Sequence, residues 1–448
     1  MATELSSSQI HLIHELKEDR DKYDLLERYY EGDAPLPEVA DGMGHAYRRF
    51  QKKARTNLAS LAVAATRERM IISGFRTGAD DDENGDKEAR RLWKANNLDV
   101  LSADLHNKML VFGEAYAIVG PAIEGGNGFP VVTVEDPRQV EVRTDERDPR
   151  IVLEAVKLFD DDEAGLDYAY FYYPDRIEVF VKERKEDETI FTIDGWAFQP
   201  EMSSVNPLGE VPVVKFENID ETGEFEPFLD IIDRINHMIL QRLVIVTTQA
   251  FKQRAIKGDL PSHDRDGNEV DYNGIFEPSP GSLWMIPEGA DIWESQQTDI
   301  QGILAGGRAD IQDFAALTRT PMHYLSPDGA NQSAEGASLS REGLVFKVED
   351  RINRVTPAWS KIMSLLFKWM GDETRAALLD LEPMWKPAER YSLAERGDAN
   401  SKFSDVPFRS RMALVGQFSP AEIAEMEIQR AGEAILTNAM IGGTGGNA

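Results

Sequence analysis

The chain contains no cysteine, and this absence narrows its chemistry at once. Disulfide bonds, thiolate zinc sites and thiol nucleophiles are all excluded. Long apolar runs are also missing, since Leu243–Val246 and Ser364–Met370 fall far below the roughly 20 residues that a membrane span needs. The N-terminal stretch Met1–Arg20 is polar and amphipathic. We therefore expect neither a signal peptide nor a membrane span.

Basic residues are scarce relative to acidic ones. The chain has 49 Lys and Arg against 79 Asp and Glu, which gives a formal net charge of −30. A protein that grips nucleic acid by neutralising phosphates needs basic patches, so this composition argues against that class. It is compatible with a protein past which DNA slides, and equally with an acidic excess that only keeps the chain soluble. With 448 residues and 42% hydrophobic content, the chain can form roughly two to four domains with a real core.

Hydrophobic periodicity predicts a mainly helical α+β fold. Apolar residues recur at helical spacing in Ser8–Tyr30, Gln51–Arg69, Ala89–Asn96, Leu101–Phe112, Phe228–Ile256, Ile300–Leu317, Ala337–Met370, Leu393–Phe403 and Pro420–Leu436. Alternation with turn signals between the runs predicts antiparallel strands at Glu114–Val119, Pro130–Val134, Gln139–Arg143, Ile151–Phe159, Asp167–Tyr173, Arg176–Lys182, Glu188–Phe198 and Val211–Phe216. A small turn-rich insertion, Lys257–Thr298, contains the strand-like segments Ser282–Ile286 and Ala290–Glu294.

The stretch Arg319–Gly336 (RTPMHYLSPDGANQSAEG) interrupts the helical pattern. Pro321 and Pro327 each disfavour helix at the preceding residue, and Asp328-Gly329 is a turn dipeptide. A loop of this length inside a compact domain is unusual and tends to be functional or disordered. It has no Lys or Arg after Arg319, and His323 is its one side chain that can become positive. We predict that this loop is the working part of the protein.

No metal site or catalytic constellation emerges from the polar residues. Asp80–Gly85 begins like a calcium loop, but Arg91 stands where a bidentate Glu is required. His11 and His14 share a predicted helix without the carboxylate that would complete a zinc pattern. The chain has no G-x-S-x-G elbow and no Walker A lysine. We therefore expect no metal, no cofactor and no catalytic residue.

Several stretches spread over most of the chain carry a family resemblance: Tyr23–Gly32 (YDLLERYYEG), Asn57–Ile71 (NLASLAVAATRERMI), Pro280–Pro287 (PGSLWMIP), Thr320–Gly336 (TPMHYLSPDGANQSAEG) and Trp385–Ala399 (WKPAERYSLAERGDA). In this order they resemble the portal proteins, or head-to-tail connectors, of tailed bacteriophages. The resemblance is greatest to the Gp6-like portals of phages that infect actinobacteria. Each stretch is a weak pattern alone, and their order makes the resemblance specific.

The resemblance implies a homododecameric ring at one capsid vertex, around a central DNA channel. It also implies a division of each subunit into wing, stem, clip and crown. Residues 1–226 match the wing, 227–257 the first stem helix, 258–298 the clip, 299–318 the second stem helix, 319–336 the tunnel loop, 337–371 the long kinked helix of the wing, and 372–448 the crown and C-terminal tail.

The resemblance also implies sites and partners. The tunnel loop would place His323, Tyr324, Asn331, Gln332, Ser333 and Glu335 at the channel constriction. The clip would present Asp264, Asp266, Tyr272, Phe276, Trp284 and Trp293 for docking. The implied partners are further copies of the chain, sliding double-stranded viral DNA, the terminase large subunit, head-completion or adaptor proteins, and the major capsid and scaffold proteins. The implied location is the portal vertex of the virion, with assembly in the host cytoplasm and no membrane contact.

Two other classes of function stay open from the residues alone. A metal-dependent hydrolase could use the acidic clusters Asp80–Glu83 or Asp160–Glu163. These acids are consecutive and lie in predicted loops, whereas convergent ligands are expected at alternate strand positions or at helical spacing. The other class is a soluble scaffold that oligomerises without forming a channel.

Overall fold

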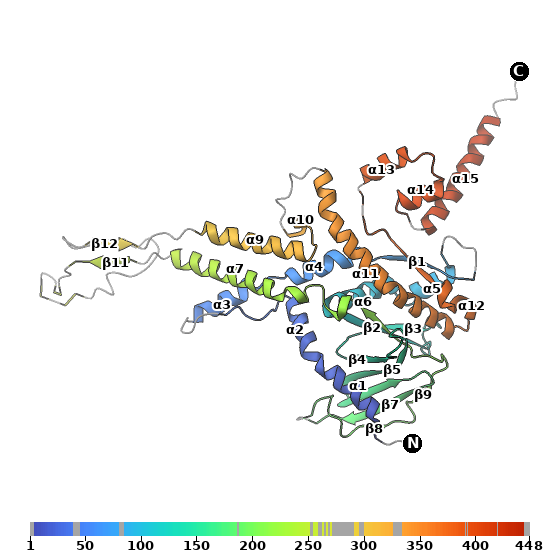
Figure 1. Ribbon diagram of the computed structural model, residues 1–448, viewed down its shortest axis with the longest axis horizontal. Helices are drawn as coiled ribbons and strands as arrows, with labels where there is room; N and C mark the ends of the chain where they lie inside the picture. The colour runs from blue at the N-terminus through green and yellow to red at the C-terminus, as the bar shows by residue number, and fades with distance from the viewer. Residues whose placement is uncertain are drawn as a thin grey trace. The chain divides into compact units, whose positions relative to one another are not determined.

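The structure, a computed structural model, describes residues 4–38, 45–79, 85–185, 188–250, 254–258, 262–263, 266–267, 269–270, 291–294, 300–325, 334–389, 391, 393–418 and 420–442. The chain divides into two compact units (Figure 1). Unit 1 comprises Met1–Arg28, Ala59–Pro227 and Arg319–Ala448, and unit 2 comprises Tyr29–Leu58 and Phe228–Thr318. Helices and antiparallel sheets together make the α+β class that the sequence predicted.

A six-stranded antiparallel sheet forms one half of the β-rich part of unit 1. Its strands are β4 (Val140–Thr144), β5 (Val152–Asp161), β6 (Leu166–Tyr172), β7 (Arg176–Glu183), β8 (Ala197–Phe198) and β9 (Ser204–Val205). Helix α1 (Ser7–Glu18) begins with a capping box between Ser6 and Gln9 and covers one face. The alternating apolar residues of the strands meet the helix in a cluster that includes Leu12, Ile13, Leu16, Val156, Leu158, Ala169, Phe171 and Phe180.

A three-stranded sheet packs near the other face of β5. It has the order β10 (Val213–Glu217), β2 (Glu114–Gly120), β3 (Val131–Glu135), and its central strand β2 is almost wholly buried. The residues that join the two sheets are Tyr116, Ile118, Val140, Val142, Ala155, Tyr172, Val211 and Val213. Helix α6 (Leu98–Phe112) leads directly into β2 through Gly113.

The helical part of unit 1 is built around α11 (Ala334–Trp369), which continues through Pro357. The fully buried Trp359 donates its indole N–H to Nε2 of His106 at 2.9 Å. Burial lowers the pKa of His106 to about 3, so the ring is a neutral acceptor at physiological pH. Further aromatic rings surround this pair, namely Phe75, Trp93, Phe216 and Trp385. One aromatic cluster thus packs around the middle of α11.

The other elements of unit 1 surround this core. They are α2 (Arg20–Tyr30, up to Arg28), α4 (Leu58–Arg67, from Ala59), β1 (Ile72–Arg76), α5 (Lys87–Ala95), the short turns η1 (Ile219–Glu221) and η2 (Glu226–Phe228, up to Pro227), α10 (Met322–Leu325), α12 (Glu373–Ala376), η4 (Leu378–Asp380), β13 (Glu382–Trp385), α13 (Leu393–Lys402), α14 (Phe408–Leu414) and α15 (Pro420–Gly442). Strands β1 and β13 pair antiparallel. Arg409 forms an ion pair with Glu427 at 3.9 Å between α14 and α15.

The turn after β10 is held against the junction between α6 and β2. Gly113 has φ of 94°, and a Cβ atom placed there would lie 2.2 Å from the carbonyl oxygen of Glu221. The Asn218 amide donates to the Gly113 carbonyl at 2.8 Å, and the Glu224 amide donates to the Leu110 carbonyl at 2.8 Å. The close approach and the positive φ both require glycine at this position.

Gly113→Ala is therefore expected to lower the free energy of unfolding by at least about 2 kcal/mol, because the side chain would strain the backbone and displace residues 218–224. Chemical denaturation at equilibrium measures this loss. Gly120→Ala is the matched control at the other end of β2, since nothing lies within 4 Å of its added Cβ. Equal stability of the two variants would show that the junction tolerates a side chain.

Unit 2 has one long helix with a shorter helix on either side. Helix α7 (Leu229–Ala250) contacts both α3 (His45–Ala54) and α9 (Gln301–Leu317) (Figure 1). Arg234 on α7 pairs with Asp310 on α9 at 2.9 Å, and Met238 lies beside Gly306. From the first contact to the second, the residue number rises on α7 and falls on α9, so the two helices are antiparallel. Strands β11 (Arg254–Lys257) and β12 (Asp291–Glu294) pair between them in sequence.

Some predicted elements have different limits in the structure. The predicted helix Ser8–Tyr30 is two helices that break at Asp19, and Gln51–Arg69 is two helices separated by residues 55–57. Phe228–Ile256 was too long, because α7 is described to Ala250 and residues 254–257 form a strand. Within Glu188–Phe198, Ala197–Phe198 alone is assigned as strand among the described residues. Strand β1 was not predicted.

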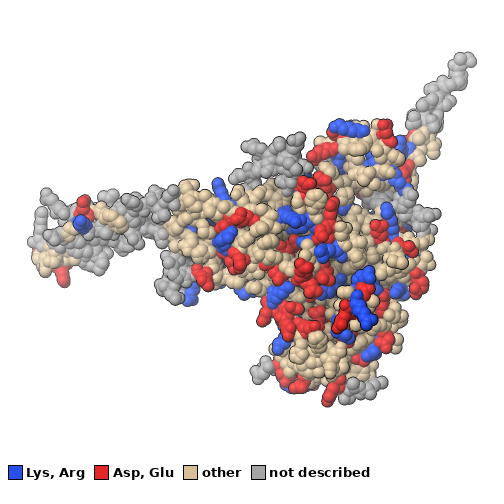
Figure 2. All heavy atoms as spheres, in the orientation of Figure 1, with Lys and Arg blue, Asp and Glu red and all other residues tan. Residues whose placement is uncertain are grey.

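The described surface carries both signs of charge. Figure 2 shows Lys and Arg interspersed with Asp and Glu on the visible face of the chain. Ion pairs link many of them, including Arg76 with Glu382 and Lys402 with Asp398. Among the helices of the described residues, none is long and apolar enough to cross a membrane.

Candidate functional site

The predicted tunnel loop is partly helical. Helix α9 ends at Leu317, and Arg319 follows with φ of 53°. The short helix α10 contains both His323 and Tyr324, so these residues do not lie in irregular backbone as predicted. Helix α11 begins at Ala334, which places the backbone of Glu335 in its first turn. Asn331, Gln332 and Ser333 lie outside the described residues.

The surroundings of His323 make it a poor cation. Its ring lies 4.7 Å from that of Tyr324. The residue is exposed, and partial desolvation together with the nearby positive charges of Arg341 and Arg69 lowers its pKa below the usual value. The sequence identified His323 as the one loop side chain that could become positive, and the structure shows an environment that opposes this. Arg69 follows α4, which is far from the loop in sequence.

The turn-rich insertion contains a two-stranded antiparallel sheet among its described residues. In the register of this sheet, Arg254 lies opposite Glu294 and Lys257 lies opposite Asp291. The expected strand Ala290–Glu294 is therefore confirmed over Asp291–Glu294, whereas Ser282–Ile286 lies outside the described residues. Trp293 is 56% exposed, and Asp266 lies in a turn. The other residues predicted for docking, Asp264, Tyr272, Phe276 and Trp284, also lie outside the described residues.

The acidic cluster Asp160–Glu163 is engaged in local structure. Arg184 pairs with Asp160 at 3.1 Å and with Asp162 at 2.5 Å. The carboxylate of Asp161 accepts from the backbone amides of Glu163 and Ala164 in the turn between β5 and β6. Across the described part of the chain, no group of three His, Asp or Glu residues could hold a metal ion. The cluster Asp80–Glu83 lies outside the described residues.

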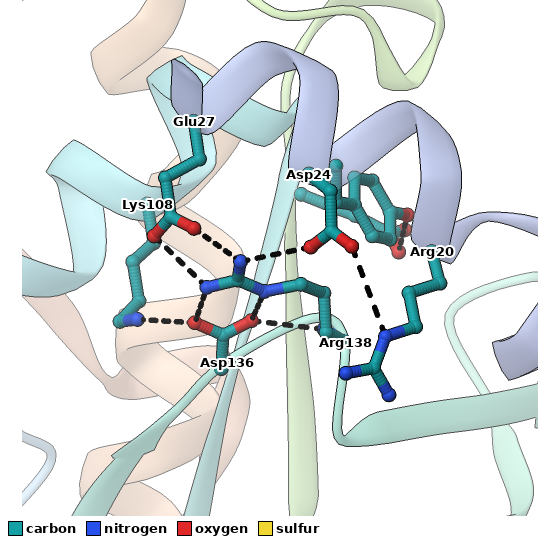
Figure 3. A network of polar contacts seen from close by, with 8 residues as sticks. Arg20, Asp24, Glu27, Lys108, Asp136 and Arg138 are labelled. Carbon is teal, nitrogen blue, oxygen red and sulfur yellow. Dashed lines mark hydrogen bonds and ion pairs between the residues drawn. The ribbon is translucent and has the colours of Figure 1, made fainter. Parts of the chain in front are cut away.

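A network of polar contacts joins α2 to the sheets (Figure 3). Arg138 lies between Asp136 on one side and Asp24 and Glu27 of α2 on the other, and it binds Asp136 through two hydrogen bonds of 2.8 and 2.9 Å. Lys108 of α6 approaches Asp136 at 2.9 Å. Burial opposes ionisation of Asp136, but hydrogen bonds from Arg138 and Lys108 outweigh it and hold its pKa below the usual range. The network fixes α2 on α6 and the β3–β4 turn.

A second cluster brings two carboxylates close to one tyrosine. Oε1 of Glu114 accepts from the hydroxyls of Tyr23 at 2.6 Å and Tyr116 at 3.0 Å, and its Oε2 lies 2.6 Å from Nζ of Lys215. The Tyr116 hydroxyl also lies 3.4 Å from Oε1 of Glu141. The Tyr116 hydroxyl has one hydrogen and cannot donate to both Glu114 and Glu141. If Glu141 is protonated, it can donate to the Tyr116 oxygen, and the two oxygens no longer repel each other. Burial and the charge of Glu114 raise the pKa of Glu141 to about 8.

A third buried group is an anion shared by two cations. Glu224 accepts from Nε of Arg351 and lies 3.0 Å from Nζ of Lys347, both on α11. All three side chains are largely buried. Burial opposes ionisation of Glu224, but the charges of Lys347 and Arg351 outweigh it and lower its pKa. This group ties α11 to the turn that Gly113 accommodates.

Sequence reasoning missed the basic character of α3. From residue 42 to residue 67 the chain has no Asp or Glu but has six Lys and Arg: Arg48, Arg49, Lys52, Lys53, Arg55 and Arg67. In a chain of net charge −30, an acid-free stretch of this length was a detectable signal. The predicted helix Gln51–Arg69 obscured it by starting within α3 and continuing past its end.

Comparison with known proteins identifies the family. A family model for phage portal proteins of the SPP1 Gp6-like type matches residues 10–435. The chain belongs to this portal family. The match spans nearly the whole chain and both units, and it confirms the resemblance that the sequence indicated. The α+β architecture is accordingly a portal fold. No curated protein sequence matches the chain.

Among the solved structures similar to this portal-family chain are three from gene transfer agent (GTA) particles. One is described as the neck of the native GTA particle computed with C12 symmetry, with 12% identity, a TM-score of 0.45, and coverage of 88% of this chain and 93% of that one. The neck of the empty particle, computed with C6 symmetry, has 11% identity, a TM-score of 0.48 and the same coverage. A chain of the native GTA virion has 14% identity, a TM-score of 0.44 and again the same coverage.

Proposed function

We propose that this chain forms the portal ring of a tailed phage-like particle, a homododecamer through which double-stranded DNA is packaged and ejected. The observation that carries this proposal is the family match over residues 10–435. The ring occupies one capsid vertex in the virion and assembles in the host cytoplasm with capsid and scaffold proteins. Its role is that of a conduit, without catalytic chemistry of its own.

The antiparallel pair α7 and α9 supports the assignment of a stem. The two helices run alongside each other and are joined in sequence through the segment that contains β11 and β12. A ring closed by rotation uses a heterologous interface, in which each subunit presents two different surfaces to its neighbours. Residues 258–298 then form the clip, where Trp293 is an exposed aromatic side chain suited to docking the terminase and later the head-completion proteins.

The remaining segments complete this assignment. Residues 1–226 and 337–371 form the wing, 319–336 the tunnel loop, and 372–448 the crown and tail. The loop has no Lys or Arg after Arg319, and the pKa of His323 is lowered, so its contacts with DNA are polar and weak. Low affinity for phosphate is what a sliding contact requires.

Negative-stain imaging and the native mass of the purified protein test the ring. Rings with a central hole and the mass of a dodecamer support the proposal. A monodisperse monomer with hydrolysis that depends on divalent cations would overturn it in favour of an enzyme. Closed or open oligomers without a central hole would favour a scaffold.

Adding positive charge to the loop is expected to hinder DNA transport. In the double variant Gln332→Lys/Ser333→Lys, each subunit presents two new cations to the phosphates, and packaging or ejection should slow by about tenfold or more. The measurement is the rate of DNA packaging into procapsids assembled with the variant. Asn127→Lys/Thr189→Lys adds the same charge at exposed positions outside the loop and should leave the rate unchanged. Unchanged transport in the loop variant would refute its place at the constriction.

A further inference from the structure

We propose that the exposed face of helix α3 binds the phosphodiester backbone of nucleic acid. Arg48, Arg49, Lys52 and Lys53 are all exposed. At 100° per residue they occupy an arc of about 140° on the helix. None of the four forms an ion pair with any other residue in the part of the chain that the structure describes. The site is distinct from the tunnel loop and does not depend on ring formation.

The opposite side of α3 is anchored within unit 2, so the cationic face has a fixed direction. Ala54 is fully buried, and Gln51 donates to the Pro37 carbonyl at 2.8 Å. Immediately after the helix, the amide and hydroxyl of Thr56 both donate to Oδ1 of the buried Asn236 on α7, at 2.9 and 2.8 Å. These contacts hold the helix on α7 and leave its cations in solvent.

Helix α3 contains no acidic residue of its own. Asp33 is already paired with Arg55, which follows the helix. The chain has no acidic residue between Asp41 and Glu68. At physiological salt, charges separated by more than a Debye length of about 8 Å are largely screened, so the overall charge does not determine what α3 attracts. A phosphate backbone close to this face meets four cations.

The composition of the face favours nucleic acid over an acidic protein. Protein interfaces have an apolar centre and are depleted in lysine. Among residues 48–55, every exposed side chain is Arg or Lys, and the apolar Phe50 and Ala54 lie on the other side of the helix. Long flexible cations without apolar neighbours are typical of contacts with phosphates, which position a protein on nucleic acid without reading its sequence.

The test is binding of a fluorescent 30-base-pair duplex to the full-length protein at increasing salt. The variant Arg48→Gln/Arg49→Gln/Lys52→Gln/Lys53→Gln should bind at least about a hundredfold more weakly at low salt, with a log–log salt slope about three units flatter. The matched control, Arg91→Gln/Arg150→Gln/Lys185→Gln/Lys402→Gln, removes the same charge from exposed side chains that have ion-pair partners. It should bind like the unmodified protein.

Three results would overturn the proposal. The first is equal binding by the α3 variant and its control. The second is binding of poly-glutamate but not DNA through the same four residues, which would make the partner an acidic protein. The third is loss of oligomer mass in the α3 variant alone, which would make the face a subunit contact. If the α3 variant keeps its oligomeric mass but no longer binds the duplex, the binding site on α3 is independent of ring formation and of the proposed conduit.

Discussion

Glu141→Gln is expected to stabilise the protein at alkaline pH, by about 5 kcal/mol at pH 9. In the folded protein Glu141 holds its proton up to a pKa of about 8, against an ordinary value of 4.5. Between these two values the folded state carries one proton more than the unfolded chain. Stability therefore falls as pH rises through this window and levels off above the folded pKa. Glutamine removes this loss because its amide is neutral at every pH.

The neighbours of Glu141 explain why the change should not damage the site. Carboxylates of Glu15 on α1 and Glu114 on β2 repel a charge on Glu141. Lys215 on β10 attracts it but is already bound to Glu114. Oε1 of Glu141 both accepts from the Val142 amide and faces the Tyr116 hydroxyl, so a glutamine carbonyl oxygen at this position can still accept from Val142 while the side chain carries no charge. The substitution thus imitates the protonated state.

Urea unfolding at pH 5, 7 and 9 checks this prediction. The stability difference between Glu141→Gln and the unmodified protein should be small at pH 5 and should grow with pH. Glu146→Gln removes a carboxyl from an exposed position in the next turn and should leave the pH profile unchanged. If Glu141→Gln keeps the slope of the unmodified protein, Glu141 is ionised in the folded state and the inferred proton is absent.

Local patterns explain why most strands could be predicted from the sequence. Strands β2 to β7 are neighbours along the chain, and turns separate runs in which apolar residues alternate with polar ones. Strand β1 was missed because its partner, β13, follows about 300 residues later in the chain. Strand β13 itself contains Pro383, which weakens the sequence pattern of a strand. Pairing over such a separation depends on the tertiary fold, which periodicity does not encode.

Helix breaks were missed for a different reason. The apolar spacing of α1 continues into α2 across Asp19, so the hydrophobic pattern alone shows one helix. Between α3 and α4, Thr56 bonds to Asn236, a residue far away in sequence, and this bond stabilises a non-helical segment. Side chains such as Thr and Asn compete with helix through these bonds. Their partners become visible in the folded structure.

The candidate site was predictable in its position more than in its chemistry. The Pro, Gly and Asn content of residues 319–336 indicated an interruption between α9 and α11. The resemblance to portal proteins then predicted that this segment is the tunnel loop. The environment of His323 could not be predicted, because it depends on Arg69 and Arg341, which only folding brings near. Total charge was similarly a poor guide to α3, since an average over the chain hides a local acid-free stretch.

Glu224→Gln is expected to cost about 3 to 5 kcal/mol of unfolding free energy, because it removes the buried carboxylate that binds both Lys347 and Arg351. Lys347 and Arg351 share this carboxylate, Arg351 also binds Asp350 at 2.6 Å, and burial already lowers the pKa of Lys347. Since the pKa of Glu224 is lowered, its stabilising effect is fully present above the ordinary pKa of glutamate. It is lost as pH falls through the lower folded value. The variant should therefore lose part of the acid sensitivity of the unmodified protein.

A double-mutant cycle with Lys347→Met separates the ion pair from general disruption. Lys347→Met removes one of the two cations, so the double variant should cost less than the sum of the single variants by at least about 1 kcal/mol. Asp398→Asn is the surface control, because its partner Lys402 is exposed and such pairs contribute at most about 1 kcal/mol. Additive costs, or a loss in Glu224→Gln no larger than that of the control, would mean that the buried group does not hold α11 to the turn. A large non-additive loss would identify Glu224 as the anion on which the position of α11 depends.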